Sequence, residues 1–199
     1  IEDPSDREVK FLKADLLMEE RRMEEAEAIH LELAQTENES TEVLLDIIMT
    51  YMDANQKEYA AKWIGKLRDK GLNETNSQKF RDLWCDFCMT FGYPEQATQA
   101  FQLSLDENPY SIPHWNGMAK CYFAQNEIEK AHEAVDFALA IDENNLEALE
   151  VKGFCYMQNE NYEEALAIYQ RLLPQAQVPS RIYALLVKCY LDMEKATEA

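Results

Sequence analysis

Residues 146–173 read LEALEVKGFCYMQNENYEEALAIYQRLL, and this stretch decides the fold. Apolar residues recur every three or four positions on both sides of a polar break at residues 158–161. Such spacing, interrupted once by turn-forming residues, is typical of two amphipathic helices joined by a turn. The stretch therefore predicts a helical hairpin.

The same pattern returns along the whole chain. One alanine recurs at intervals of 34, 37, 34, 34 and 34 residues, at Ala26, Ala60, Ala97, Ala131, Ala165 and Ala199. Tyr51, Tyr122, Tyr156 and Tyr190 each lie nine residues before one of these alanines. Stacked helix pairs need a small residue once per repeat, at the point where two helices approach most closely. The spacing therefore predicts a repeat array.

The alanines also define the repeat units. With each alanine counted as position 20, the units are 7–40, 41–74, 78–111, 112–145 and 146–179, with a partial sixth unit at 180–199. We expect these units to form a single array over residues 1–199. Because the sequence begins with Ile1 and Ala199 falls where a second helix should only be starting, we also expect a fragment of a longer protein.

Helix-start signals agree with this division. Pro94 is suited to the first turn of a second helix, and glutamates crowd the predicted first turns, where the helix dipole favours anions. These glutamates are Glu24, Glu25, Glu95, Glu127, Glu129, Glu163 and Glu164. No run of alternating apolar residues indicates a strand, so the predicted fold class is all-α.

Several columns in register resemble the tetratricopeptide repeat family. The family pattern places Trp, Leu-Gly, Tyr, Ala, Phe and Pro at fixed positions of a repeat of about 34 residues. The matching residues are Trp115, Ala119, Tyr122 and Ala131, then Leu149, Gly153, Tyr156 and Ala165, and Ala97, Phe101 and Pro109. Lys10, Lys13, Arg81 and Lys152 depart from columns that are usually apolar. The resemblance implies a right-handed superhelical solenoid of stacked antiparallel helix pairs, with about five and a half repeats.

The net charge restricts the class of partner. The chain has 38 acidic and 19 basic residues, a net charge of −19. Nucleic-acid binding is disfavoured, because it depends on Lys and Arg displacing phosphate counterions. No stretch approaches the roughly 18 uninterrupted apolar residues of a membrane span. A basic or amphipathic protein segment is the expected partner, although the acids could instead cap helices and keep the array in solution.

Five cysteines allow a redox, a metal-binding or a structural interpretation. Cys85 and Cys88 form a Cys-x-x-Cys sequence, but they occupy core columns of a predicted helix rather than the βαβ setting of a redox motif. Cys121, Cys155 and Cys189 all fall at position 10, too far apart in a helical stack for a disulfide. We therefore expect small core residues and no metal site. The odd number favours a reducing compartment, so the expected location is the cytoplasm.

No nucleophile elbow, phosphate-binding glycine loop or metalloprotease histidine pair occurs in the sequence. His30, His114 and His132 share no column of the repeat. The sequence therefore predicts neither an enzyme nor a bound metal or cofactor.

The resemblance implies that the first helix of each pair lines a concave groove with positions 2, 5, 6, 9, 12 and 13. The predicted groove residues are Asp15, Met18, Asp46, Met49, Met52, Asp86, Met89, Lys120, Phe123, Glu150, Phe154 and Met157. Position 12 is apolar in all six units and methionine in four of them. Thioether side chains adapt to different ligands, which suits a peptide-binding surface, but the same methionines could serve packing alone.

Two functions remain open from the sequence. The favoured one is a non-catalytic scaffold that binds a peptide or helical segment of another protein in the groove. The alternative is a structural or self-association module attached to a domain outside this segment, so the oligomeric state is left open. Family members that grip the carboxylate end of a chaperone tail resemble one another in a clamp of Lys, Asn and Arg residues. No three consecutive units supply that clamp here.

Overall fold

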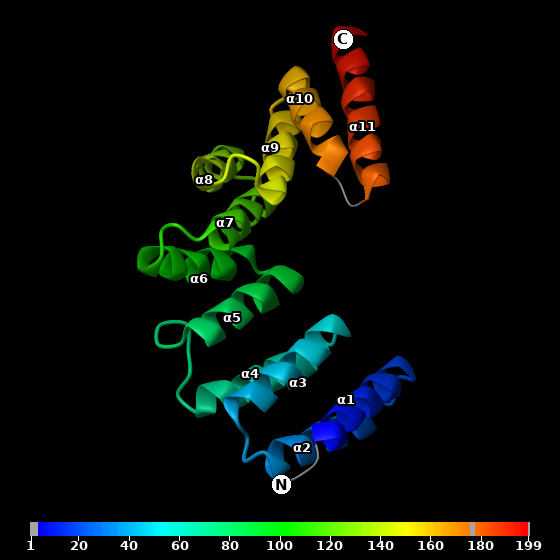
Figure 1. Cartoon of the computed structure of the whole chain (residues 1–199), viewed down its shortest axis with the longest axis vertical. Helices are drawn as coiled ribbons and strands as arrows, with labels where there is room; N and C mark the ends of the chain where they lie inside the picture. The colour runs from blue at the N-terminus through cyan, green and yellow to red at the C-terminus, as the bar shows by residue number, and fades with distance from the viewer. Residues whose placement is uncertain (1–3, 176–177, 199) are drawn as a thin grey trace. The chain divides into compact units, whose positions relative to one another are not determined.

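The computed structural model describes residues 4–175 and 178–198, and within these ranges it contains eleven α-helices and no strand (Figure 1). The predicted all-α fold is confirmed. The helices are α1 (Pro4–Glu19), α2 (Met23–Thr36), α3 (Thr41–Asp53), α4 (Lys57–Asp69), α5 (Gln78–Thr90), α6 (Pro94–Glu107), α7 (Ile112–Ala124), α8 (Ile128–Ile141), α9 (Leu146–Gln158), α10 (Tyr162–Leu172) and α11 (Pro179–Glu198). A short 3-10 turn, η1 (Leu173–Gln175), follows α10.

The chain folds as two compact units, an N-terminal unit (Ile1–Phe91) with α1 to α5 and a C-terminal unit (Gly92–Ala199) with α6 to α11. Within the N-terminal unit, α1 packs on α2 and α3 packs on α4. Within the C-terminal unit, α7 packs on α8 and α9 packs on α10, which also contacts α11. These four pairs correspond to four predicted repeat units. The helices of predicted unit 78–111 fall in different compact units.

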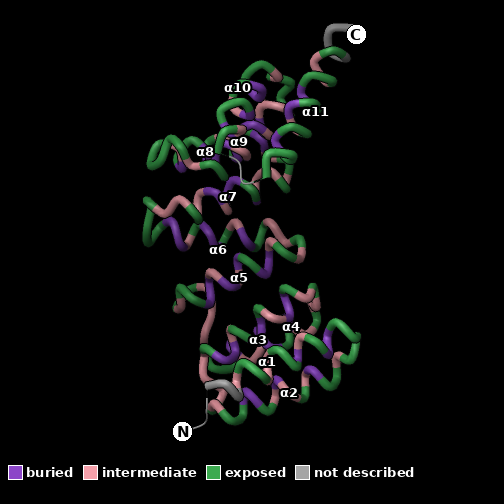
Figure 2. The backbone as a smooth tube through the Cα atoms, turned by 45° about the vertical axis from the view of Figure 1, so that its right-hand side comes forward, coloured by how far each residue is buried: buried purple, intermediate pink, exposed green. Residues whose placement is uncertain are grey.

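The small-residue column lies in the core, as the repeat predicts. Ala26, Ala60, Ala97, Ala131 and Ala165 are all completely buried. Figure 2 shows buried residues recurring along the helices. Ala199, the sixth member of the column, lies outside the described residues.

The first helix of each repeat unit is followed, at position 15 of the unit, by a residue of positive φ. These first helices are α1, α3, α5, α7 and α9. These residues are Arg21 (62°), Asn55 (55°), Gly92 (79°), Asn126 (60°) and Glu160 (60°). At four of the turns the next amide donates to a carbonyl five residues earlier, in Arg22 to Leu17, Gln56 to Tyr51, Glu127 to Tyr122 and Asn161 to Tyr156, at 2.8–2.9 Å. This is the Schellman arrangement, which satisfies carbonyls at the end of a helix.

Side-chain caps begin three of the first helices. Ser40 Oγ accepts from the amide of Val43, Ser77 Oγ from that of Phe80, and Asn145 Oδ1 from that of Ala148. Pro94 opens α6, as predicted. The expected glutamates occupy the first turns of the second helices α2, α6, α8 and α10, with Glu127 at the N-cap of α8.

The last helix differs from the sequence-based expectation. The repeat register places a turn near Glu194, followed by a new helix at Ala199, but α11 continues without a break to Glu198. Residues 192–198 read DMEKATE and contain no glycine, asparagine or proline that would favour a turn.

Charged residues in the usually apolar columns are accommodated by specific partners. Arg81 is 2% exposed, and its guanidinium donates to the backbone oxygen of Glu74 at 3.1 Å and to Gln78 Oε1 at 2.6 Å. Lys10 pairs with Glu32, and Lys152 pairs with Asp136. The charges of Arg81, Lys10 and Lys152 are thus met by polar partners, which offsets the cost of placing them in these columns.

All five cysteines are buried, which confirms their predicted place in the core. Cys85 and Cys88 are 1% and 0% exposed on α5, and Cys121, Cys155 and Cys189 are completely buried. Burial raises the pKa of Cys121 and Cys155 to about 11, so both thiols stay protonated at neutral pH.

An aromatic cluster fills the interior of the N-terminal unit around His30. The imidazole of His30 is completely buried, 4.9 Å from the ring centre of Tyr51, 5.7 Å from that of Phe11 and 6.5 Å from that of Trp63. Burial lowers the pKa of His30 to about 4. The imidazole is therefore neutral at physiological pH and acts as an aromatic core residue.

No helix in the described part of the chain combines the length and the apolar character that spanning a bilayer requires.

Candidate partner-binding groove

The C-terminal unit contains an open groove of about 670 Å³, called here the C-terminal groove. Its lining residues come from α7, from α9, from the end of α10, from the start of α11 and from Val178 just before α11. They are Lys120, Phe123, Leu146, Glu147, Glu150, Val151, Phe154, Leu172, Val178, Arg181 and Ile182. Seven of these eleven residues are apolar, and all four charged residues belong to α7, α9 or α11.

Aromatic rings of neighbouring first helices form part of the groove wall. Phe123 on α7 and Phe154 on α9 have ring centres 6.0 Å apart, and both are half-buried. Phe154 is supported from the core by Tyr169 on α10, with ring centres 6.2 Å apart and the planes at 67°. Because Tyr169 is completely buried, the packing of the core fixes the position of Phe154.

One pair of charges links α7 to α9 at the groove. Lys120 Nζ donates to Glu147 Oε1, and Asn116 Nδ2 donates to Glu147 Oε2 at 2.8 Å and to Asn145 Oδ1 at 3.0 Å. Partial burial acts to raise the pKa of Glu147, but the hydrogen bonds from Lys120 and Asn116 and the charge of Lys120 outweigh it and lower the pKa. Glu147 is therefore ionised and held in place at neutral pH.

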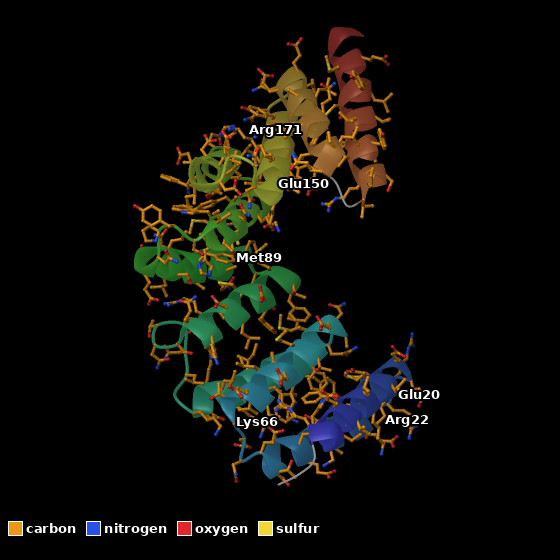
Figure 3. All side chains as sticks on the ribbon, viewed as in Figure 1. Glu20, Arg22, Lys66, Met89, Glu150 and Arg171 are labelled. Atoms are coloured by element: carbon orange, nitrogen blue, oxygen red, sulfur yellow. The ribbon has the colours of Figure 1, made fainter. Side chains whose placement is uncertain are left out.

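A second pair of charges links α9 to α11. Arg181 Nη2 lies 2.5 Å from Glu150 Oε1. The Glu150 side chain is 20% exposed, whereas that of Arg181 is 65% exposed. Glu150, labelled in Figure 3, projects from the central helix α9. The groove thus has two acids and two bases, each acid paired with a base.

The N-terminal unit has two hollows between α1 and α3, called here the N-terminal hollows. The first, of about 690 Å³, is lined by Arg7, Glu8, Phe11, Leu12, Asp15, Asp46 and Thr50. The second, of about 480 Å³, is lined by Asp15, Met18, Glu19, Thr50, Asp53, Ala54 and Gln56. Asp15 and Thr50 line both, so the two hollows adjoin.

The N-terminal hollows are acidic. Partial burial and the neighbouring charges of Glu19 and Asp53 raise the pKa of Asp15. Arg7 is the one base among the lining residues, and it lies 2.5 Å from Asp46 and 3.2 Å from Glu37. Acids therefore exceed bases around these hollows, unlike in the C-terminal groove.

Seven of the twelve predicted groove residues line one of these three cavities. Lys120, Phe123, Glu150 and Phe154 meet in the C-terminal groove, and Asp15, Met18 and Asp46 line the N-terminal hollows. The other five, Met49, Met52, Asp86, Met89 and Met157, line none of the three.

The methionine column has a mixed environment. Met18 and Met52 are only 8% and 9% exposed, so most of their surface serves packing. Met89, labelled in Figure 3, and Met157 are half-buried, and Met157 Sδ lies 3.6 Å from the hydroxyl of Tyr169. Met49 at position 9 is 54% exposed and available to a ligand. On α5, burial and the charge of Asp82 raise the pKa of the predicted groove residue Asp86.

Sequence reasoning missed several lining residues. Glu147 and Arg181 fall at position 2 and Val151 at position 6, which the resemblance already places in the groove, so the repeat register could have found them. Leu146 at position 1 and Val178 before α11 carry no such signal.

The described residues include no group of three or more His, Cys, Asp or Glu side chains arranged to hold a metal ion.

Comparison with known proteins identifies the repeat. The tetratricopeptide repeat family profile matches residues 129–189. Anaphase-promoting complex subunit 7 of Dictyostelium discoideum is 32% identical over 94 residues, which cover 46% of this chain and 16% of that protein. The chain therefore spans only about a sixth of the length of this relative.

Solved structures extend the similarity to most of the chain. The tetratricopeptide repeat protein TTC0263 of Thermus thermophilus has a TM-score of 0.64 and 17% identity, covering 92% of this chain and 98% of that one. The first such domain of Spaghetti (RPAP3), bound to the HSP90 peptide SRMEEVD, has a TM-score of 0.53 and 19% identity, covering 55% of this chain and 89% of that one. At these identities the similarity is one of fold.

Four observations point to the same repeat. They are the column of buried alanines, the repeated hairpin turns, the family match and the shared fold. Residues 129–189 match the tetratricopeptide repeat family, and most of the chain has the fold of solved tetratricopeptide repeat proteins.

Proposed function

We propose that this chain is a non-catalytic scaffold that binds a segment of another protein along the first helices of its repeats. The observation that carries this proposal is the C-terminal groove, an open, mainly apolar space of about 670 Å³. Its lining includes Lys120 and Phe123 from predicted unit 112–145 and Glu150 and Phe154 from predicted unit 146–179. Pockets of roughly 300–1,000 Å³ with apolar walls and a few polar groups are typical ligand sites. The peptide held by the RPAP3 domain is consistent with this mode of binding.

The bound segment is expected to differ from a chaperone tail. Asn116 and Lys120 would be the nearest equivalents of carboxylate-gripping residues, but both already donate to Glu147. Glu147 and Glu150 add negative charge to the same wall. A terminal carboxylate would therefore meet occupied donors and two ionised acids.

The N-terminal hollows favour a basic segment. Their lining includes Asp15, Glu19, Asp46 and Asp53 and a single base, Arg7, that already pairs with an acid. The pKa of Asp15 is raised by burial and by the charges of Glu19 and Asp53, and a Lys or Arg side chain would offset the repulsion from these two acids. We propose a reducing compartment such as the cytoplasm as the working environment, because all five cysteines are buried thiols.

Selection of peptides from a random display library against the full chain tests the proposal. Asp15→Lys should remove peptides that bind the N-terminal hollows, and Leu146→Glu should remove those that bind the C-terminal groove. Ile141→Glu is the matched control, because Ile141 is 39% exposed and Leu146 is 38% exposed, but only Leu146 lines the groove. Equal recovery of peptides by all three variants and the unmodified chain would contradict the proposal.

A second candidate function is self-association through α11. This helix buries Ile182, Leu186 and Cys189 on the α10 side, while an opposite stripe of apolar residues is more than half exposed. The stripe consists of Tyr183, Val187, Tyr190 and Leu191. Its spacing of i, i+4, i+7 and i+8 is that of a helix packed on both faces.

Light scattering on the unmodified chain and on a Tyr183→Glu, Val187→Glu variant tests self-association. A dimer that becomes monomeric in the variant supports it. A monomer at all concentrations rules it out.

A further inference from the structure

The C-terminal groove differs from the rest of the chain in its charge balance. The whole chain has a net charge of −19, yet this groove contains two acids and two bases. Lys120 pairs with Glu147 and Arg181 pairs with Glu150. The groove is therefore locally neutral, and its charged groups already have partners.

Because these charges are already paired, a charged ligand gains little binding free energy here. A Lys or Arg that approached Glu147 or Glu150 would have to displace a base already in contact, and an acidic side chain would have to displace the acid from Lys120 or Arg181. Entry into a half-buried groove also removes water from the incoming charge. Charged anchors therefore gain little at this position and lose their hydration.

The apolar lining favours the binding of apolar side chains. Leu146 is 38% exposed and Val178 is 60% exposed, and both line the same groove as the half-buried rings of Phe123 and Phe154. Covering this surface releases water at no electrostatic cost. A volume of about 670 Å³ is in the range of sites for drug-sized ligands.

We infer that the C-terminal groove binds a partner segment through uncharged apolar side chains, and that its paired charges select against Lys, Arg, Asp and Glu at the anchor positions. The inference rests on the proposed function and names the chemistry of its ligand at one site. It differs from the expectation for the N-terminal hollows, where unbalanced acids favour basic side chains.

Leu146→Glu is the variant that tests this surface with least damage to the fold. Leu146 is the first residue of α9, where the helix dipole favours an acid. The variant therefore places a charge beside the groove without removing a core side chain. Thermal unfolding of Leu146→Glu and Ile141→Glu, compared with the unmodified chain, checks that all three are folded.

The experiment is a selection of random peptides on the full chain, followed by sorting on the variants. Groove peptides are those that bind the unmodified chain and Ile141→Glu but not Leu146→Glu. We expect them to be enriched in Leu, Ile, Phe, Met and Trp at their shared positions and depleted of charged residues there. Their affinity should change by less than about twofold between roughly 0.05 M and 0.5 M salt, because screening acts on charges.

The possible failures are distinct. Groove peptides with charged residues at the shared positions, or with an affinity that falls about tenfold over the same salt range, would overturn the inference and leave the proposed function standing. If every recovered peptide lost binding only to Asp15→Lys, the inference would likewise be overturned and the proposed function would stand. Failure to recover any peptide sensitive to either variant would contradict the proposed function itself.

Discussion

Gly153 on α9 lies directly beneath the ring of Tyr169 on α10. A Cβ atom at position 153 would be 2.6 Å from Cε1 of Tyr169, closer than the non-bonded contacts that Cβ atoms make in proteins. The glycine thus lets α10 pack against α9, and the same tyrosine supports Phe154 in the C-terminal groove. The ring of Tyr169 therefore takes part both in the packing of α10 on α9 and in the support of the groove wall.

Gly153→Ala should lower the free energy of unfolding by about 1–3 kcal/mol, because the added methyl group must displace a buried ring. Gly65→Ala is the matched control. It lies within α4, and no atom is within 4 Å of the point that its Cβ would occupy, so it should raise the free energy by about 0.5–1 kcal/mol through helix propensity. Urea unfolding measures both. Equal effects of the two alanines would contradict the close packing.

Glu160→Gly should stabilise the C-terminal unit by about 0.5–1 kcal/mol, because a non-glycine residue in the left-handed region is strained. Glu160 has a φ of 60°, while the equivalent residue is Asn55, Gly92 or Asn126 in three other repeats and Arg21 in the first. Glu160→Ala keeps the backbone strain and should give no gain. Thermal unfolding of both variants measures the difference, and an equal gain from alanine would refute the explanation.

Protonation of His30 should destabilise the N-terminal unit as the pH falls. Burial lowers its folded pKa to about 4, below the value of about 6.5 in an unfolded chain, so the unfolded state binds the proton first. The stabilising effect is complete above pH 6.5 and is lost as the pH falls toward 4. Between pH 7 and pH 5 the loss is about 2 kcal/mol.

The His30→Leu variant isolates this contribution from that of the acids. Its free energy of unfolding, measured by urea denaturation with tryptophan fluorescence, should depend less on pH than that of the unmodified chain. Because raised carboxyl pKa values such as that of Asp15 remain in both proteins, their effect cancels in the comparison. Parallel pH profiles for the two proteins would show that His30 is not buried as a neutral group.

Cys121 and Cys155 should resist alkylation in the folded protein. Burial raises the pKa of both thiols to about 11, which lowers the thiolate fraction about a hundredfold relative to an ordinary cysteine. Iodoacetamide labelling followed by peptide mass spectrometry, with and without urea, measures each site separately. Rapid labelling of Cys121 in the native protein would contradict its place in the core.

The fold was predictable because its determinants are local and repeated. Buried Ala131 and Ala165 occupy one column, and Asn55 and Asn126 mark turns that their sequence favours. The turn at Glu160 was less visible, since glutamate carries no preference for positive φ and the backbone bonds of the turn impose it.

The groove was only partly predictable because it depends on contacts between helices. Phe123 and Phe154 were found from their columns, but Met52 in the same column as Phe123 is buried. The pairing of Arg181 with Glu150 joins helices separated by the whole of α10, and no local pattern specifies it. Rotation of each helix about its axis decides which side of a column faces the groove.

Calorimetric titration of a groove peptide, performed at several temperatures and at two salt concentrations, tests the central claim most directly. If the C-terminal groove buries uncharged apolar side chains, the heat-capacity change of binding is negative and the affinity changes by less than about twofold between roughly 0.05 M and 0.5 M salt. A heat-capacity change near zero, with an affinity that falls about tenfold as salt increases, would contradict the account.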